Sequence, residues 1–231
     1  MHRSIQIPAT IALMATTASS IAAQQDGREP LDLLTLQMSS VGSALPLSWQ
    51  TRAVRGQSVP ATVIVDSGGV RYLHISGTKR AAWFYRELDF PLDAASGTLE
   101  WSWRVPKAPE GASSAHAATD DAALRVFVVF ARHGVFATSP RALFYTVADG
   151  EPTYVQGRAP VATSVIVGRP SQTRTWTSAE ANPRLDYRRL WGGTAPRIVA
   201  IGVMQDTDQT MTLAIGDLSR LDWRFYHAAA P

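Results

Sequence analysis

Four aspartates and one arginine are the residues of this chain best suited to act together. Two aspartates begin the stretch "DDAALRVFVVF", and two more stand in "QDTDQT". The first stretch reads as a strand that is apolar on both faces, yet it carries an arginine. A guanidinium that is buried without a partner is very costly, so this arginine requires a carboxylate. The predicted polar cluster comprises Asp120, Asp121, Arg125, Asp206 and Asp208.

Spacing indicates which carboxylate pairs with Arg125. In an extended chain Asp120 and Asp121 point to opposite faces. Asp121 has the parity of Arg125 but lies roughly 13 Å away along a strand, at about 3.3 Å per residue. We therefore predict that Asp206 or Asp208 holds Arg125 from the adjacent strand, with Asp121 closing the cluster from the loop side. In this interpretation the network is structural and fastens neighbouring strands.

A divalent cation is the alternative occupant of the cluster. Calcium takes six to eight oxygen ligands, mostly carboxylates and carbonyls. The stretch "QDTDQT" supplies an Asp-x-Asp pair but lacks the third acid, the glycine and the distant glutamate of an EF-hand loop. We favour the structural network and expect no cofactor, with calcium as the open alternative. Zinc is disfavoured because His74, His116 and His133 lack ligand spacing.

Aromatic residues form a second candidate site. Trp83, Trp101, Trp103 and Trp223 fall at inward positions of alternating strands, which predicts a place in the core. Four others lie at or beside loops with arginine and aspartate neighbours. Flat rings flanked by charged groups bind sugars by stacking and hydrogen bonding. The predicted ligand-binding residues are Trp176, Tyr187, Trp191, Tyr145 and Arg125, and the alternative for Trp191 is packing of a short helix onto a sheet.

No motif indicates catalysis. Glycoside hydrolysis needs two carboxylates at a set distance, and no spacing pairs any two glutamates of the chain. Nucleophile-elbow, P-loop and dinucleotide fingerprints are absent from the sequence. We expect no catalytic residues, although a triad assembled in space would leave no such trace.

Alternating strands must position these residues. In "TLEWSWRV" and "RLDWRF", every second residue is apolar. The composition of Asp66 to Gly69 predicts a hairpin turn. Asn182, Pro183 and Gly192 are an N-cap, a first helical residue and a C-terminal stop, which predict one short connecting helix. Further strands are predicted at 83–88, 124–131, 142–147, 164–167, 174–179, 198–205 and 211–215.

This pattern predicts an all-β fold: a two-sheet antiparallel β-sandwich, jelly-roll-like or concanavalin-like, with one short helix. The domain boundaries that we expect are a signal peptide at 1–23, an N-terminal lead-in segment at 24–44 and a single sandwich domain at 45–231. The leader combines a basic start at Arg3, an apolar run and small residues at Ser20 and Ala22.

Composition sets further bounds. The chain has 231 residues, no cysteine and a formal net charge of +3. Without cysteine there are no disulfides, thiolate metal sites or cysteine nucleophiles. The arginines are scattered between acids, so we expect no nucleic-acid partner. We also expect no integral membrane segment after leader cleavage, and a periplasmic or secreted location in a Gram-negative bacterium.

Six stretches give the chain a resemblance to a known family. They are "LPLSWQ" at Leu45, "LEWSWRV" at Leu99, "DDAALRVFVVF" at Asp120, "ALFYTVA" at Ala142, "LDYRRLWGG" at Leu185 and "IVAIGVMQDTDQT" at Ile198. Through them the chain resembles the bacterial family catalogued as domain of unknown function 3047. The chain departs from that family at "EANPR" and at Gln209. The resemblance implies a secreted β-sandwich and brings no catalytic residues.

The function that we expect is that of an exported, non-catalytic binding module whose partner is a carbohydrate. This step rests on analogy of fold. The alternatives are a polysaccharide-active hydrolase or lyase, and an envelope domain that binds another protein. The ligand, the oligomeric state and the sheet topology stay open.

Overall fold

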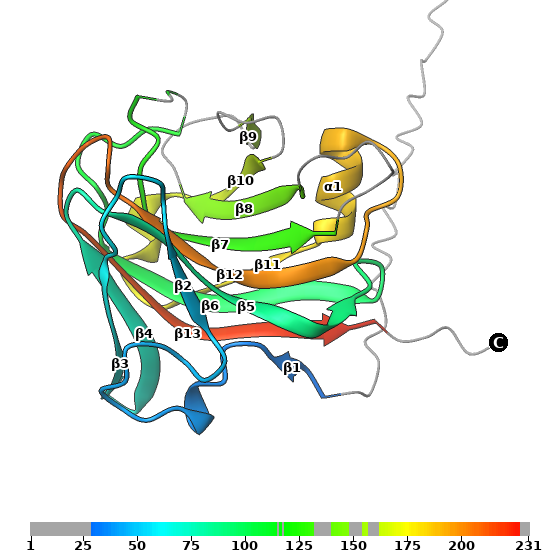
Figure 1. Cartoon of the computed structure of the whole chain (residues 1–231), viewed down its shortest axis with the longest axis horizontal. Coiled ribbons are helices and arrows are strands. Elements are labelled where there is room, and N and C mark those ends of the chain that lie inside the picture. Colours follow the sequence, from blue (N-terminus) through cyan, green and yellow to red (C-terminus); the bar gives the residue numbers. More distant parts are fainter. Residues whose placement is uncertain are drawn as a thin grey trace, which may run out of the picture.

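In a computed structural model, the chain folds into two β-sheets packed face to face (Figure 1). The structure describes residues 29–114, 116, 118–131, 140–147, 154–156 and 162–226. The predicted signal peptide at 1–23 lies outside the described residues. The prediction of a two-sheet β-sandwich is confirmed.

One sheet has six strands within the described part of the chain, in the order β11-β6-β13-β4-β3, with β1 paired to β13. Its strands are β1 (Leu31–Asp32), β3 (Ala61–Ser67), β4 (Val70–Gly77), β6 (Gly97–Lys107), β11 (Thr177–Ala181) and β13 (Ala214–Phe225). Leu33 and Leu34, which follow β1, are buried in the core. Part of the segment predicted as a lead-in therefore packs with the sandwich.

The other sheet has seven strands among the described residues, in the order β2-β5-β12-β7-β8-β10-β9. Its strands are β2 (Gln50–Ala53), β5 (Ala81–Leu92), β7 (Ala122–Phe130), β8 (Ala142–Val147), β9 (Tyr154–Gln156), β10 (Ala162–Gly168) and β12 (Ile198–Asp206). All its pairings are antiparallel except that of β8 with β10, which is parallel. The sheet is therefore mixed, whereas the sequence predicted an antiparallel one.

Three short helices connect the strands in the described part of the chain: the 3-10 helices η1 (Leu36–Met38) and η2 (Pro170–Thr173), and the α-helix α1 (Pro183–Trp191). The prediction of α1 is confirmed: Asn182 caps it by accepting a hydrogen bond from the Leu185 backbone, and Gly192 ends it with φ of 71°. Figure 1 shows α1 at one end of the sandwich, beside β7 and β8.

Local sequence explains the strand boundaries that differ from the prediction. The predicted strand at 211–215 begins only at Ala214, because Met211 adopts φ of 56°, and it continues without a break through "RLDWRF" as β13. The hairpin between β3 and β4 turns at Gly68 and Gly69, both with positive φ. Such values favour glycine, so this part of the prediction is confirmed.

The inward faces of both sheets form one core. Trp101, Trp103 and Trp223 lie there fully buried, as predicted. Trp83 does not: it is half-buried on the outward face of the seven-stranded sheet, where it packs on a separate apolar cluster. The prediction of a core position for Trp83 is therefore wrong. The physical reason is that β5 is apolar on both faces, so that Phe84 points into the core in its place.

Candidate functional site

The polar cluster lies where β7 begins and β12 ends, and Arg125 is its most buried cation. The Arg125 side chain is 6% exposed and donates from Nη2 to the side chain of Asp120 at 2.6 Å and to its backbone carbonyl at 2.8 Å. The prediction that this guanidinium is buried beside carboxylates is confirmed. The predicted partner is wrong, because Arg125 forms its ion pair with Asp120 and not with Asp206 or Asp208.

The conformation of the chain at the start of β7 explains why Arg125 pairs with Asp120 and not with the predicted aspartates. Asp120 and Asp121 precede the strand, which begins at Ala122, and the chain turns there, with the Asp121 backbone N–H donating to the carbonyl of Thr119 at 2.8 Å. The side-chain directions expected for an extended chain therefore do not apply to Asp120. Asp120 folds back over Arg125 from the loop.

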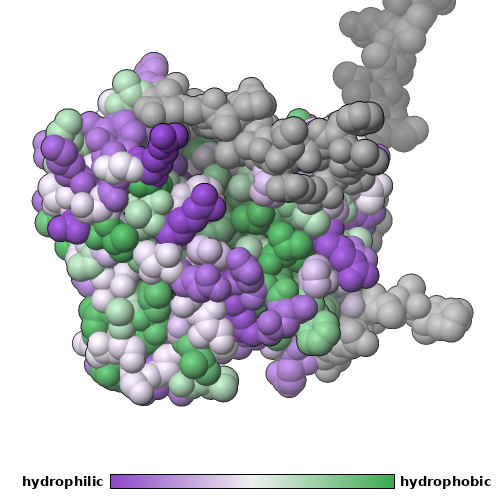
Figure 2. Space-filling view, in the orientation of Figure 1, coloured by the Kyte–Doolittle hydropathy of each residue, from purple (hydrophilic) through white to green (hydrophobic). Residues whose placement is uncertain are grey.

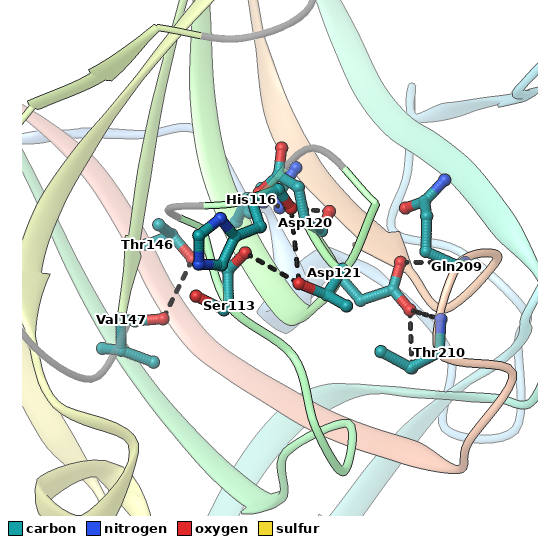
Figure 3. Close-up of polar contacts among 10 residues, drawn as sticks. Ser113, His116, Asp120, Asp121, Thr146, Val147, Gln209 and Thr210 are labelled. Atoms are coloured by element: carbon teal, nitrogen blue, oxygen red, sulfur yellow. Dashed lines mark hydrogen bonds and ion pairs between the residues drawn. The ribbon is translucent and has the colours of Figure 1, made fainter.

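Asp121 fastens the turn that follows β12. Its carboxylate accepts hydrogen bonds from the backbone of Gln209 at 3.3 Å and of Thr210 at 2.7 Å, and from the Thr210 hydroxyl at 2.6 Å (Figure 3). Asp121 is 4% exposed. Three donors in a buried position hold the carboxylate in one orientation, as the predicted role in closing the cluster requires.

Asp206 and Asp208 complete the cluster. One carboxylate oxygen from each of Asp121, Asp206 and Asp208 lies within 4.8 Å of the others. Burial raises the pKa of Asp206 to about 7; Arg125 opposes this shift, and the carboxylates of Asp208 and Asp121 add to it. The structure thus brings all five predicted members together, in an arrangement different from the one expected.

The chemistry of this cluster is that of hard oxygen donors. Its side-chain ligands are carboxylates, which suit calcium, magnesium or manganese better than zinc or copper. Oxygens of Asp206 and Asp208 lie within 4.8 Å of each other, which is closer than the two carboxyls that flank a glycosidic bond in hydrolases.

An aromatic face extends from the cluster across the outer side of the seven-stranded sheet. Phe127, Phe144 and Met204 are its buried floor, and Trp83 and Tyr85 are half-buried against them. The Trp83 ring meets Phe127 edge-on at 5.0 Å between centroids and Phe144 at 5.2 Å. These contacts fix the orientation of the Trp83 ring.

Polar side chains border this aromatic face. Arg52 and Gln50 of β2 are exposed and stand opposite Trp83 and Tyr85 in the sheet, which places them on the same side. Glu87, two residues after Tyr85, shares that side and is exposed. Figure 2 shows hydrophobic side chains gathered among hydrophilic ones over the strands of this sheet. The face thus offers both rings and hydrogen-bonding groups.

Two of the predicted ligand-binding aromatics lie inside the protein instead. Tyr145 and Tyr187 are 0% and 1% exposed, and both belong to the core. The Tyr145 hydroxyl donates to Asp186 at 3.1 Å, and the Tyr187 hydroxyl accepts from Arg141 at 2.6 Å. A buried ring presents no face to a ligand, so these two tyrosines do not form a sugar-stacking surface. They connect α1 to the seven-stranded sheet instead.

Trp191 packs as its alternative interpretation predicted. Its ring lies edge-on to Tyr187 at 4.9 Å, and the Arg141 guanidinium lies over it at 5.0 Å. Trp191 remains half-buried, at the end of α1. Its position is that of a residue that docks the helix.

Trp176 lies on the opposite sheet. Its half-buried ring is covered by the guanidinium of Arg104 at 4.8 Å and contacts Tyr72 edge-on at 5.5 Å. Arg104 also donates to the buried Asp217 at 2.6 Å, and His74 contacts the same carboxylate at 2.7 Å. Burial lowers the pKa of Arg104, but the ion pair with Asp217 outweighs it and leaves that pKa raised. The predicted ligand role of Trp176 stays a prediction.

The chain belongs to a family whose members are described as protein of unknown function, DUF3047, because the family model matches residues 47–221. Among curated proteins, none matches the chain. Within the described residues, no helix is long and apolar enough to cross a membrane.

Several solved structures align with this chain at low identity. A family 11 carbohydrate-binding module of a cellulosomal cellulase of Clostridium thermocellum aligns with 11% identity and a TM-score of 0.45, over 86% of this chain and 96% of that one. The family 11 xylanase of Neocallimastix patriciarum aligns with 11% identity and a TM-score of 0.44, over 76% and 90%. Endoglucanase 3 of Trichoderma harzianum, from family GH12, aligns with 10% identity and a TM-score of 0.42, over 78% of this chain and 98% of that one. At these identities and TM-scores, the likenesses assign no ligand to this chain.

Proposed function

We propose that this member of the DUF3047 family is an exported, non-catalytic module that binds carbohydrate on the outer face of its seven-stranded sheet. The observation that carries the proposal is the pair of half-buried rings, Trp83 and Tyr85, held on a floor of buried phenylalanines. The rings occur at alternate positions of β5, so they lie side by side along one strand.

Stacking of a sugar requires a ring that does not move when the ligand arrives. Trp83 meets this condition, since Phe127 and Phe144 brace it edge-on and leave its remaining surface to solvent. A pre-oriented ring costs less entropy on binding than a free one. The floor beneath it is apolar, so desolvation of the site is inexpensive.

Sugar hydroxyls also require hydrogen-bonding partners around the rings. The exposed Gln50, Arg52 and Glu87 supply an amide, a guanidinium and a carboxylate on the same side of the sheet. Together they can donate to and accept from hydroxyl groups. An apolar platform with a few polar groups at its edge is typical of small-ligand sites.

The experiment is a glycan array on the purified protein, followed by calorimetry with the strongest ligand. We expect Trp83→Ala to weaken binding by about tenfold or more, since a stacked aromatic contributes over 1 kcal/mol when its buried area is included. Arg52→Ala should weaken binding without touching the apolar floor, because Arg52 is exposed. Thermal melts of each variant separate a loss of binding from a loss of folding.

Trp176→Ala is the matched control, because it removes a half-buried tryptophan from the other sheet. If the sugar binds over Trp83, as proposed, the affinity of Trp176→Ala should equal that of the unmodified protein. If Trp176→Ala loses binding and Trp83→Ala does not, the ligand lies beside Trp176 on the six-stranded sheet, as the sequence-based prediction of a ligand role for Trp176 requires. Binding of a protein partner but of no glycan would contradict the proposal altogether.

A hydrolase or lyase is the second candidate, and one observation favours it. Asp206, with its pKa raised to about 7, would be protonated often enough to act as a general acid. Against this, glycoside hydrolysis needs two carboxyls about 5 Å or more apart on either side of the bond, whereas oxygens of Asp206 and Asp208 lie within 4.8 Å of each other. Release of reducing ends or unsaturated products from a bound glycan, lost in Asp206→Asn, would decide for the enzyme.

A further inference from the structure

Asp121, Asp206 and Asp208 come from two separate segments and converge at one point. Asp121 precedes β7, Asp206 is the last residue of β12, and Asp208 lies in the turn beyond it. One oxygen from each lies within 4.8 Å of the other two. Three carboxylates this close repel one another unless a proton or a cation lies between them.

A second observation concerns the hydrogen bonds of these carboxylates. Asp206 is 9% exposed, and its Oδ1 has no hydrogen-bond partner among the described residues. The Oδ1 of Asp208 is also buried, and it too is without a hydrogen bond within the described part of the chain. Buried carboxylate oxygens nearly always accept a hydrogen bond, so two oxygens without one, in neighbouring carboxylates, call for an explanation.

Among the described residues, no ion pair joins a cation to any of these three carboxylates. Arg125 favours the charged form of Asp206 through its positive charge, but its own ion pair is with Asp120, at 2.6 Å, which lies outside the group of three. The three carboxylates thus carry up to three negative charges. Hydrogen bonds from the backbone of Gln209 and Thr210 fix the position of the Asp121 carboxylate, so this carboxylate is already oriented before any ligand binds.

We infer that Asp121, Asp206 and Asp208 bind a calcium ion. All the side-chain donors are carboxylate oxygens, the ligands that hard cations prefer. Calcium is favoured over magnesium because it loses its water readily and accepts many carboxylate ligands in irregular geometry, whereas magnesium usually takes one or two carboxylates and keeps several waters. The bound ion would tie the start of β7 to the end of β12 and satisfy both orphan oxygens.

The test uses the purified protein after dialysis against chelator, with calcium as the only added ligand. Equilibrium dialysis should give one calcium per chain. The melting temperature should rise by about 5–10 °C when free calcium is a hundred times the dissociation constant. Asp208→Asn should weaken the affinity by about tenfold or more, since calcium affinity depends on the number of charged ligands. Asp206→Asn serves as a second variant should Asp208→Asn fail to fold.

Asp222→Asn is the matched control, because it removes one half-buried carboxylate from the six-stranded sheet. It should bind calcium as the unmodified protein does. Absence of binding at millimolar calcium overturns the inference, and so does equal binding by folded Asp208→Asn and Asp206→Asn. Equal affinity for magnesium overturns the assignment to calcium. No sugar is present in any of these measurements, so their outcome is separate from that of the proposed function.

Discussion

Gly202 lies in β12, an interior strand of the seven-stranded sheet, and replacing it with alanine should destabilise the protein. A Cβ at this position would lie 2.2 Å from the backbone oxygen of Phe84 and 2.7 Å from the Cα of Tyr85. Both are backbone atoms of the paired strand β5, where Gly202 stands opposite Tyr85. Neither atom belongs to a flexible side chain, so β5 and β12 themselves would have to separate.

The size of the effect follows from that separation. To reach 3.4 Å, the lower limit of ordinary contact, the strands must move apart locally by about 1.2 Å. Such a shift weakens two or three ladder hydrogen bonds, each with a net contribution of about 1 kcal/mol. Replacing a strand glycine by alanine returns roughly 0.5–1 kcal/mol of backbone entropy. The loss from the weakened hydrogen bonds is larger than the gain in backbone entropy, so we expect Gly202→Ala to lower the free energy of unfolding by about 2 kcal/mol.

Urea unfolding followed by circular dichroism measures this difference. Gly168→Ala in β10 is the matched control, because its Cβ would meet only side-chain atoms at 3.6 and 3.7 Å. The control should be neutral or slightly stabilising. If Gly202→Ala proves as stable as the unmodified protein, then β5 and β12 do not approach as closely as the structure shows.

Two further predictions concern pH and export. Burial raises the pKa of Asp222 to about 6, with Arg220 opposing and the acids Asp32 and Glu100 adding to the shift. Because the folded state then holds the proton more tightly than the unfolded chain, stability should fall as pH rises from about 4 to about 6. Asp222→Asn should therefore stabilise the protein at pH 7.5 by about 1–2 kcal/mol after allowance for solvent screening. In urea unfolding, an equal gain at pH 4 would show that burial of the charge is not the cause. Intact-mass measurement of exported protein should show loss of the chain up to about Ala23, whereas a full-length mass in the membrane fraction would make the leader an anchor.

Local signals in the sequence were sufficient for the parts of the fold that local chemistry determines. The cap at Asn182, the first-turn proline and the stop at Gly192 specify α1 without reference to the rest of the chain. The glycine pair at 68 and 69 specifies the hairpin in the same way. Alternation in "TLEWSWRV" assigns Trp101 and Trp103 to the core, since the other face of that strand is polar.

The alternation of residues along a strand did not predict which side chains point into the core where the strand is apolar on both faces. β5 carries aromatic residues at successive positions, so nothing in its sequence indicates whether Trp83 or Phe84 points inward. The pairing with β12 decides it, and that pairing is a long-range property. The signal that was available is the double-sided apolar character of β5 and β7, because a sandwich strand with an apolar outer face requires a cover or a ligand. Tyr145 was misplaced for a related reason, since its hydroxyl partner comes from α1.

The irregular pairing of β7 with β12 beside Arg125 determines how the acidic cluster and the aromatic face lie relative to each other. Met204 stands opposite both Trp83 on β5 and Arg125 on β7, whereas two residues later Asp206 stands opposite Ala122, so β7 contains one extra residue there. A bulge of this kind bends the strand and re-aims side chains. It allows Asp121 to meet Asp206 while Phe127 stays under the Trp83 ring. The acidic cluster and the aromatic face are therefore consequences of one register, and a ligand that orders the cluster also orders the strand ends beside the rings.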